Sequence, residues 1–273
     1  MVKVCGKMDV KYILMVFLLG IVMFVVFLYT ENPSEDQIMS RMASSVDDVS
    51  FYGFDINITL KNTGYRADRY LDIKMIINGI GRVDIKNKIA KFTTDVDVSS
   101  NDLKSRSYSE KGIDVYVVND TIYTLPFGMW IKNKVQPESN LWNNQTHIRQ
   151  QVDIMKNSKI KLIGGELING VMTYHLDIEP DRNTLVEYVL KSGGTVSELN
   201  YERIGNLTNI ITALNMDLWV SKIDYLPVKS VVYIETYTNN ITADMTVVTD
   251  FYDYNKKSGI ELPDLSNAVE IRD

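Results

Sequence analysis

Residues 51–64 read FYGFDINITLKNTG, and apolar and polar side chains alternate along this stretch. The apolar residues that share one face are Tyr52, Phe54, Ile56, Ile58 and Leu60. The polar residues of the opposite face are Asp55, Asn57, Thr59 and Lys61. A period of two predicts a β-strand with one buried face and one solvated face.

The same alternation recurs on the C-terminal side of this stretch. Its apolar positions include Leu71, Ile73, Met75, Ile77, Val83, Ile85, Phe92, Val96 and Val98. Three longer strands are predicted near the end of the chain, at 209–222, 226–238 and 241–254. Turn pairs at Asn87-Lys88, Asn119-Asp120 and Asn169-Gly170 join some of these runs, and such short links require antiparallel strands.

Three short segments have helical spacing instead. Ser34 and Gln37 form a potential capping box before apolar residues that recur every three or four positions, which predicts a helix over about 35–48. Further helices are predicted over about 146–156 and 181–191. Long strands with one apolar face must cover that face. We therefore expect a mainly β (α+β) fold, a curved antiparallel sheet or half-open barrel with short helices in its concave side.

An uncharged apolar segment precedes this predicted domain. Residues 12–29 read YILMVFLLGIVMFVVFLY, and as a helix of about 27 Å they nearly match a hydrocarbon core of about 30 Å. The flanking charges are Lys3, Lys7 and Lys11 before the segment and Glu31, Glu35 and Asp36 after it. We therefore expect residues 1–11 in the cytoplasm, 12–29 as a single-pass anchor in the bilayer, and 30–273 as one extracytoplasmic domain.

A cleaved signal peptide is the alternative interpretation of the apolar segment. It predicts a shorter apolar run followed by small residues at a processing site. The segment ends in LYTENPSE, which lacks that pattern, so a retained anchor is favoured.

Composition restricts the partners of the exported part. The chain has a formal net charge of −6, and an acidic surface repels nucleic-acid backbones, so no nucleic-acid partner is expected. Its one cysteine, Cys5, lies before the anchor, so disulfides do not staple the domain. Candidate N-glycosylation sequons stand at Asn57, Asn119, Asn144, Asn206 and Asn240, all on predicted polar faces, turns or loops.

Three segments carry a family resemblance. They are WVSKIDYLPVKSVVYI at 219–234, GIDVYVVNDTIYTLPFGMW at 112–130 and KLIGGELINGVMTYHLDIEPD at 161–181, and GIELPDLSNAVEI follows near the end. With Trp219, Leu226, Pro227 and Val228 at matching positions, the chain resembles membrane-anchored archaeal relatives of the LolA and LppX lipoprotein carriers. Ser221 stands where an acidic residue is common, and there is no lipobox. The resemblance implies a curved sheet that holds helices in an apolar cavity able to accept acyl chains.

Catalytic and metal-binding patterns are absent from the sequence. There is no G-x-S-x-G elbow, no phosphate-binding glycine loop and no cluster of zinc ligands. His147 and His175 are interpreted as solvated surface residues, and the Asp95/Asp97 and Asp250/Asp253 pairs as solvated faces. We therefore expect no enzyme activity, no cofactor and no metal.

The remaining hypothesis is a binding protein whose apolar strand faces hold a lipid, lipoprotein or other apolar ligand. The cavity candidates are Met39, Met42, Phe54, Ile56, Ile58, Ile73, Met75, Phe92, Val115 and Trp219. The alternative is a glycosylated structural or interaction protein of the cell surface with a filled barrel. Ordinary core packing is the competing interpretation for each candidate residue.

Overall fold

The computed structural model describes residues 33–66, 69–101, 107–125, 129–134, 142, 147–184, 186, 208–256 and 259–270. The predicted cytoplasmic segment and anchor, residues 1–29, lie outside these ranges. Among the helices of the described ranges, none has the length and apolar character needed to cross a bilayer.

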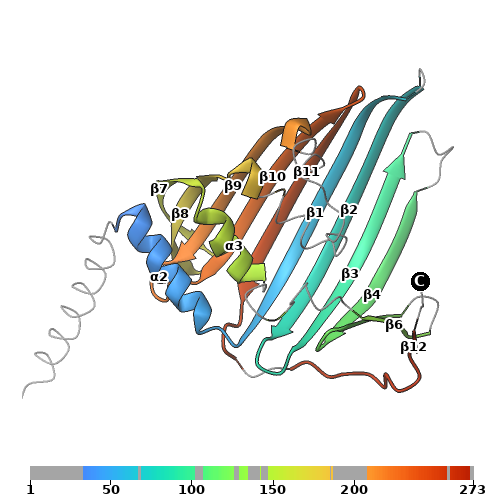
Figure 1. Cartoon of the computed structure of the whole chain (residues 1–273), viewed down its shortest axis with the longest axis horizontal. Helices are drawn as coiled ribbons and strands as arrows, with labels where there is room; N and C mark the ends of the chain where they lie inside the picture. The colour runs from blue at the N-terminus through green and yellow to red at the C-terminus, as the bar shows by residue number, and fades with distance from the viewer. Residues whose placement is uncertain are drawn as a thin grey trace, which may run out of the picture.

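A single twelve-stranded sheet organises the described part of the chain (Figure 1). Its strands are β1 (Phe51–Arg66), β2 (Arg69–Asp84), β3 (Ile89–Ser100), β4 (Tyr108–Val118), β5 (Thr121–Thr124), β6 (Ile131–Lys134), β7 (Lys159–Ile168), β8 (Val171–Glu179), β9 (Ile211–Ser221), β10 (Pro227–Thr238), β11 (Ile241–Tyr252) and β12 (Val269–Glu270). They lie in the order β12-β6-β5-β4-β3-β2-β1-β11-β10-β9-β8-β7. Neighbouring strands are antiparallel except β6 and β12, which are parallel.

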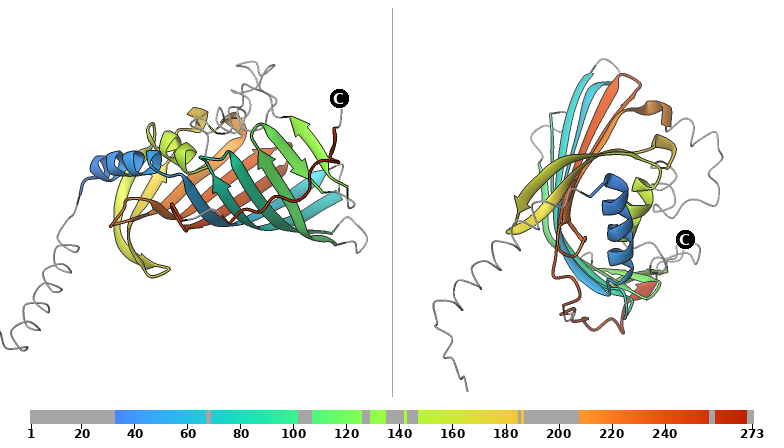
Figure 2. Two further views of the ribbon diagram at one scale, coloured as in Figure 1. Left: turned by 90° about the horizontal axis from the view of Figure 1, so that it is seen from below. Right: turned by 90° about the vertical axis from the view of Figure 1, so that its left-hand side faces the viewer.

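The sheet is curved (Figure 2), and it is open because β7 and β12 are its two edges. The predicted mainly β fold with a curved antiparallel sheet is confirmed. β1 and β2 have 16 residues each, which corresponds to about 50 Å of extended chain. β1 pairs with β2 on one side and with β11 on the other, so the first and last long strands meet in the middle of the sheet.

Two helices lie against the concave side, over the end of the sheet that contains β7 to β10 (Figure 2). They are α2 (Glu35–Asp47) and α3 (His147–Met155). The capping box of Ser34 and Gln37 is formed, and both predicted helices are confirmed. Of the third predicted helix, residues 182–184 and 186 are helical, and the rest of its span lies outside the described residues.

The core lies between these helices and the strands beneath them. The buried apolar side chains of the helices are Ile38, Met42, Val46, Ile148, Val152 and Met155. They form one cluster with concave-side residues of the sheet, among them Tyr52, Tyr174, Leu176, Ile178, Met216, Leu218, Val220 and Phe251. The alternation of each strand therefore decides which of its side chains reach this core.

Gly79 and Gly81 let aromatic rings settle onto the concave side of β2. A Cβ atom at Gly79 would lie 2.7 Å from Cζ of Phe92, and a Cβ atom at Gly81 would overlap the Phe54 ring. The two rings stack with centroids 5.8 Å apart. Because the two glycines have no side chains, the rings of Phe54 and Phe92 occupy the space above them.

The turn predictions can be compared with the backbone angles. Asn169 and Gly170 have φ of 51° and 81°, as a type I′ hairpin requires, and Asn119 has φ of 52° between β4 and β5. Lys88 has φ of 53° in the β2–β3 turn. One boundary was wrong: residues 208–210 are helical, and the strand predicted from 209 begins at Ile211.

Candidate functional site

Most of the predicted cavity residues lie together on the concave side. Cross-strand register aligns Phe54 with Gly81, Gly81 with Phe92, and Phe92 with Val115. The other members of this set on β1 and β2 are Ile56, Ile58, Ile73 and Met75. All of these apolar side chains are half-buried, so each still exposes part of its surface.

Further residues extend this surface, although they were not among the predicted candidates. They are Leu60, Ile77, Val96 and Val98 on β1 to β3, and Val232, Ile234, Met245 and Val247 on β10 and β11. Register places Ile58 opposite both Ile77 and Val247, which joins the two halves of the surface. We call the half-buried apolar residues on the concave side of β1 to β4, β10 and β11 the apolar face.

The two methionine candidates belong to α2. Met42 is fully buried in the core between helix and sheet, whereas Met39 is half-buried at its margin. Met39, Ala43, Val152 and Ile160 line part of a groove of about 320 Å³ between α2, α3 and β7. Met39 is therefore accessible in this groove rather than on the apolar face, and Met42 belongs to the core.

Trp219 does not lie with the other candidates. Its neighbours Leu218 and Val220 point into the core, so the alternation of β9 turns Trp219 to the convex side. There its ring stacks on His175 at 4.4 Å, and Nζ of Lys229 lies 5.6 Å from the ring centroid. Trp219 was predicted to line the ligand cavity, but the alternation of β9 places it on the opposite, convex side.

His175 also differs from expectation, because its side chain is only 15% exposed. Nε2 lies 2.8 Å from Oδ1 of Asp217, and Nδ1 lies 2.7 Å from Oε1 of Glu166. The imidazole is on the polar convex face as predicted, but Trp219 and the two carboxylates enclose it. This cluster ties β7, β8 and β9 together. The side chain of His147 lies outside the described residues.

The convex side carries a groove of about 340 Å³ across β1, β2, β3 and β11. Its polar lining comprises Asp55, Asn57, Asn78, Thr93, Asp95 and Asp250. Tyr252 donates to Asp55 at 2.7 Å, and burial followed by this hydrogen bond raises the pKa of Tyr252. Oδ1 of Asp95 accepts from the backbone N–H of Gly112 at 2.8 Å. Within the described residues, no three His, Cys, Asp or Glu side chains are grouped as metal ligands.

The predicted glycosylation sites occupy different environments. Asn119 and Asn240 are exposed in the β4–β5 and β10–β11 turns. Asn57 lies in the middle of β1 on the convex side, where its Nδ2 donates to Oδ1 of Asn78 at 2.6 Å. Asn144 and Asn206 lie outside the described residues.

Comparison with known proteins places the fold beside several solved structures. The lipoprotein LppX of Mycobacterium tuberculosis shares 11% identity with a TM-score of 0.43, over 84% of this chain and 100% of that one. LprF of Mycobacterium bovis shares 12% with a TM-score of 0.45, over 85% and 99%. A DUF1329 family protein of Desulfovibrio piger shares 12% with a TM-score of 0.26, over 82% and 92%.

No protein-family model matches the sequence, and no curated protein matches it. All three TM-scores are below 0.5, so these similarities carry no argument about function.

Proposed function

We propose that this protein is a membrane-tethered extracytoplasmic binding protein that holds a lipid or other apolar ligand on the apolar face of its curved sheet. The observation that carries the proposal is the half-exposure of aliphatic side chains over the concave side of neighbouring strands. Ile58, Ile77 and Val247 illustrate it, because they are register partners on three adjacent strands and none is fully covered.

Such a surface favours an acyl chain over a polar ligand. Each methylene group moved from water onto an apolar surface contributes about 0.8 kcal/mol. The sheet offers no charged side chain on the apolar face of β1 and β2 between Tyr52 and Leu60 or between Met75 and Val83. Affinity would therefore increase with chain length, and the ligand's polar end would have to be accommodated beside this surface.

The predicted anchor would hold the binding domain close to a membrane. The predicted apolar segment ends at residue 29 and α2 begins at Glu35, so the five residues 30–34, which can span at most about 3.5 Å each, separate the predicted anchor from α2. A domain held this close exchanges a ligand with the adjacent membrane or with a partner docked beside it. The proposal assigns no chemical reaction to the chain.

The second candidate is a glycosylated structural or interaction protein of the cell surface. The exposed positions of Asn119 and Asn240 in turns favour it, because glycans there would extend into solvent. In that case the apolar face serves packing only.

A matched pair of substitutions on β2 separates the two candidates. Ile77 lies on the apolar face, and the adjacent Ile76 lies on the convex side opposite Thr59; both are half-buried. The full chain, Ile77→Asp and Ile76→Asp are each reconstituted in nanodiscs and analysed for bound lipid by native mass spectrometry. Lipid bound by the wild type and by Ile76→Asp but lost from Ile77→Asp supports the carrier. Equal lipid on both variants, or none on the wild type, rejects it.

A further inference from the structure

Three uncharged polar side chains converge beneath α3, where the alternation of the strands would place apolar ones. Ser230 occupies the concave side of β10 between Val228 and Val232, and Thr249 occupies that of β11 between Val247 and Phe251. Ser230 and Thr249 are register partners. Gln151 of α3 lies against Ser230, and its Nε2 donates to Oγ of Ser230 at 3.0 Å.

All three are buried. The exposed fractions are 6% for Gln151, 1% for Ser230 and 0% for Thr249. Yet Oε1 of Gln151 and Oγ1 of Thr249 have no hydrogen-bond partner. A buried polar atom without a partner has lost its hydrogen bonds to water without replacement, so both atoms are stabilised in any state in which a partner reaches them.

The unpaired atoms adjoin the apolar face. Thr249 is the register partner of Ile56 and shares its side of β11 with Val247, so both of these half-buried residues are its direct neighbours. A chain lying along Ile58 and Val247 would therefore end beside Thr249. The cluster then offers a hydroxyl donor in Thr249 and a carbonyl acceptor in Gln151.

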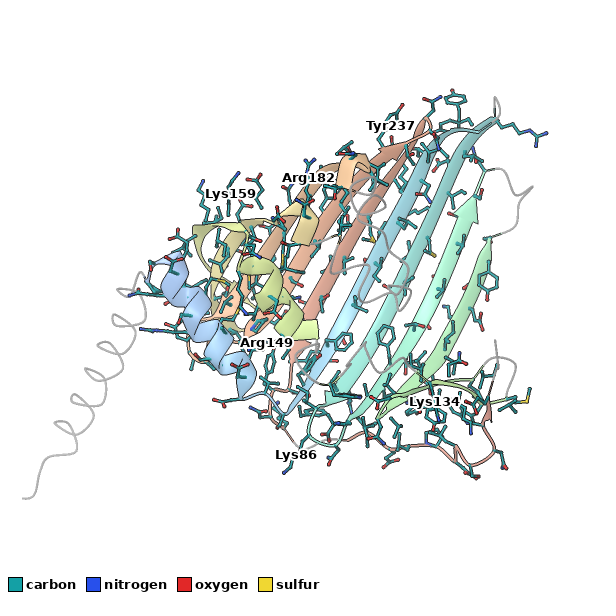
Figure 3. All side chains as sticks on the ribbon, viewed as in Figure 1. Lys86, Lys134, Arg149, Lys159, Arg182 and Tyr237 are labelled. Atoms are coloured by element: carbon teal, nitrogen blue, oxygen red, sulfur yellow. The ribbon has the colours of Figure 1, made fainter. Side chains whose placement is uncertain are left out.

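The chemistry of the cluster selects against charge. None of its members is ionisable, and an ion buried without a counter-charge loses its hydration without compensation. Arg149 precedes Gln151 by two positions on α3, and residues two apart on a helix do not share a face. The side chain of Arg149 is labelled in Figure 3. Its guanidinium is paired with Asp47 of α2, so it does not supply that counter-charge.

We propose that Gln151, Ser230 and Thr249 form a subsite for the uncharged hydrogen-bonding end of an amphiphile, such as a hydroxyl group, while its apolar chain lies on the apolar face. The inference rests on the proposed function and adds the class of ligand to it. Because Thr249 is fully covered, α3 or the Gln151 side chain moves aside when the ligand enters, and the ligand then pairs the two free atoms.

The test uses two probes that differ only at the polar end. Diazirine-bearing 1-hexadecanol and diazirine-bearing hexadecanoate are added at pH 8 to the full chain in phosphatidylcholine vesicles. The readout is the probe concentration that gives half-maximal cross-linking to peptides of β10 and β11. We expect the alcohol to half-saturate at a concentration about three- to tenfold lower than the carboxylate, as one or two neutral hydrogen bonds provide.

Thr249→Val keeps the shape of the side chain and removes the hydroxyl. It should abolish the preference for the alcohol, leave cross-linking by the carboxylate unchanged, and not lower the thermal unfolding temperature, because no hydrogen bond is lost in the empty protein. Thr246→Val is the control, since Thr246 lies on the same strand but opposite Thr59 on the convex side.

The possible results separate the two claims. If neither probe cross-links to β10 or β11, the proposed apolar binding itself fails. If both probes half-saturate alike in the wild type, or if Thr249→Val weakens both alike and lowers the unfolding temperature, the subsite is rejected and apolar binding stands.

Discussion

At the scale of single residues, the hydrogen atom that serves as the side chain of Gly81 is what admits the Phe54 ring to the concave side of β2. Gly81→Ala places a methyl carbon 2.1 Å from Cζ of that ring, and overpacking of this kind costs about 1–3 kcal/mol. Chemical denaturation of the full chain should show that loss. Adding Phe54→Leu should recover part of it, because the smaller side chain vacates the space.

Gly259→Ala is a suitable control for this experiment. The nearest atom to a Cβ there is Nη1 of Arg82 at 3.1 Å, at the end of a flexible side chain. A loss of stability at Gly259 as large as that at Gly81, or no recovery with Phe54→Leu, would contradict the role given to the ring.

Tyr254 allows a prediction about pH. Its hydroxyl donates to the backbone carbonyl of Pro227 at 2.8 Å, and burial, followed by the nearby Tyr52 and Asp224, raises its pKa well above 10.0. The folded state thus favours the neutral phenol. Its contribution is complete below the unfolded pKa of about 10 and is lost as pH rises toward the folded pKa.

Tyr254→Phe removes this titration. We expect the variant to be less stable by about 1 kcal/mol at pH 7, from the lost hydrogen bond, and to lose less stability than the wild type between pH 9 and 11. Denaturant titrations at several pH values measure both effects. Parallel stability curves for the two proteins would show that Tyr254 does not ionise on unfolding.

At the scale of elements, α2 holds the exposed edge of the sheet. Oε1 of Glu35 accepts from the backbone N–H of Leu162 on β7 at 3.1 Å. Hydrogen bonds from its own backbone N–H and from Leu162 lower the pKa of Glu35. The contact is therefore present above the unfolded pKa of Glu35 and is lost as pH falls through the lower folded value.

Glu35→Ala should lower the protection of the Leu162 N–H against hydrogen exchange, relative to its intrinsic rate at each pH. The protection in the wild type should approach that of the variant in strong acid, where Glu35 is protonated. The Ser34 and Gln37 capping box should survive, since neither side chain uses the Glu35 carboxylate. Unchanged exchange at Leu162 would mean that another group protects this edge amide.

Local sequence patterns determine much of this architecture but not all of it. The period-two runs identified β1 and β2 and the shared face of Phe54, Ile56 and Ile58, because alternation is a property of each strand alone. The place of Trp219 and the meeting of Gln151 with Ser230 depend on register and on where α3 packs. Polar residues that interrupt apolar alternation, such as Ser230 between Val228 and Val232, were the available signal for the buried polar cluster.

At the scale of the whole molecule, the predicted orientation across the bilayer can be measured with the native thiol. Cys5 is the only cysteine and belongs to the segment expected in the cytoplasm. A membrane-impermeant maleimide added to intact cells should leave it unlabelled until the membrane is permeabilised. Asn239→Cys in a Cys5→Ser background should be labelled directly, because Asn239 lies in the exposed β10–β11 turn. Labelling of Cys5 in intact cells would reverse the topology.

The pairing of β1 with β11 also dictates how the protein is assembled. Of the long strands β1 is made first and β11 last, so the pairing in the middle of the sheet cannot form until almost the whole chain has been synthesised. Pairings this distant in sequence form slowly. Until then one edge of β1 is unpaired and the apolar face of β1 to β4 is exposed. The half-made sheet is therefore vulnerable to aggregation. Any factor that protects the half-made sheet would therefore have to hold the N-terminal hairpin until β11 has been made.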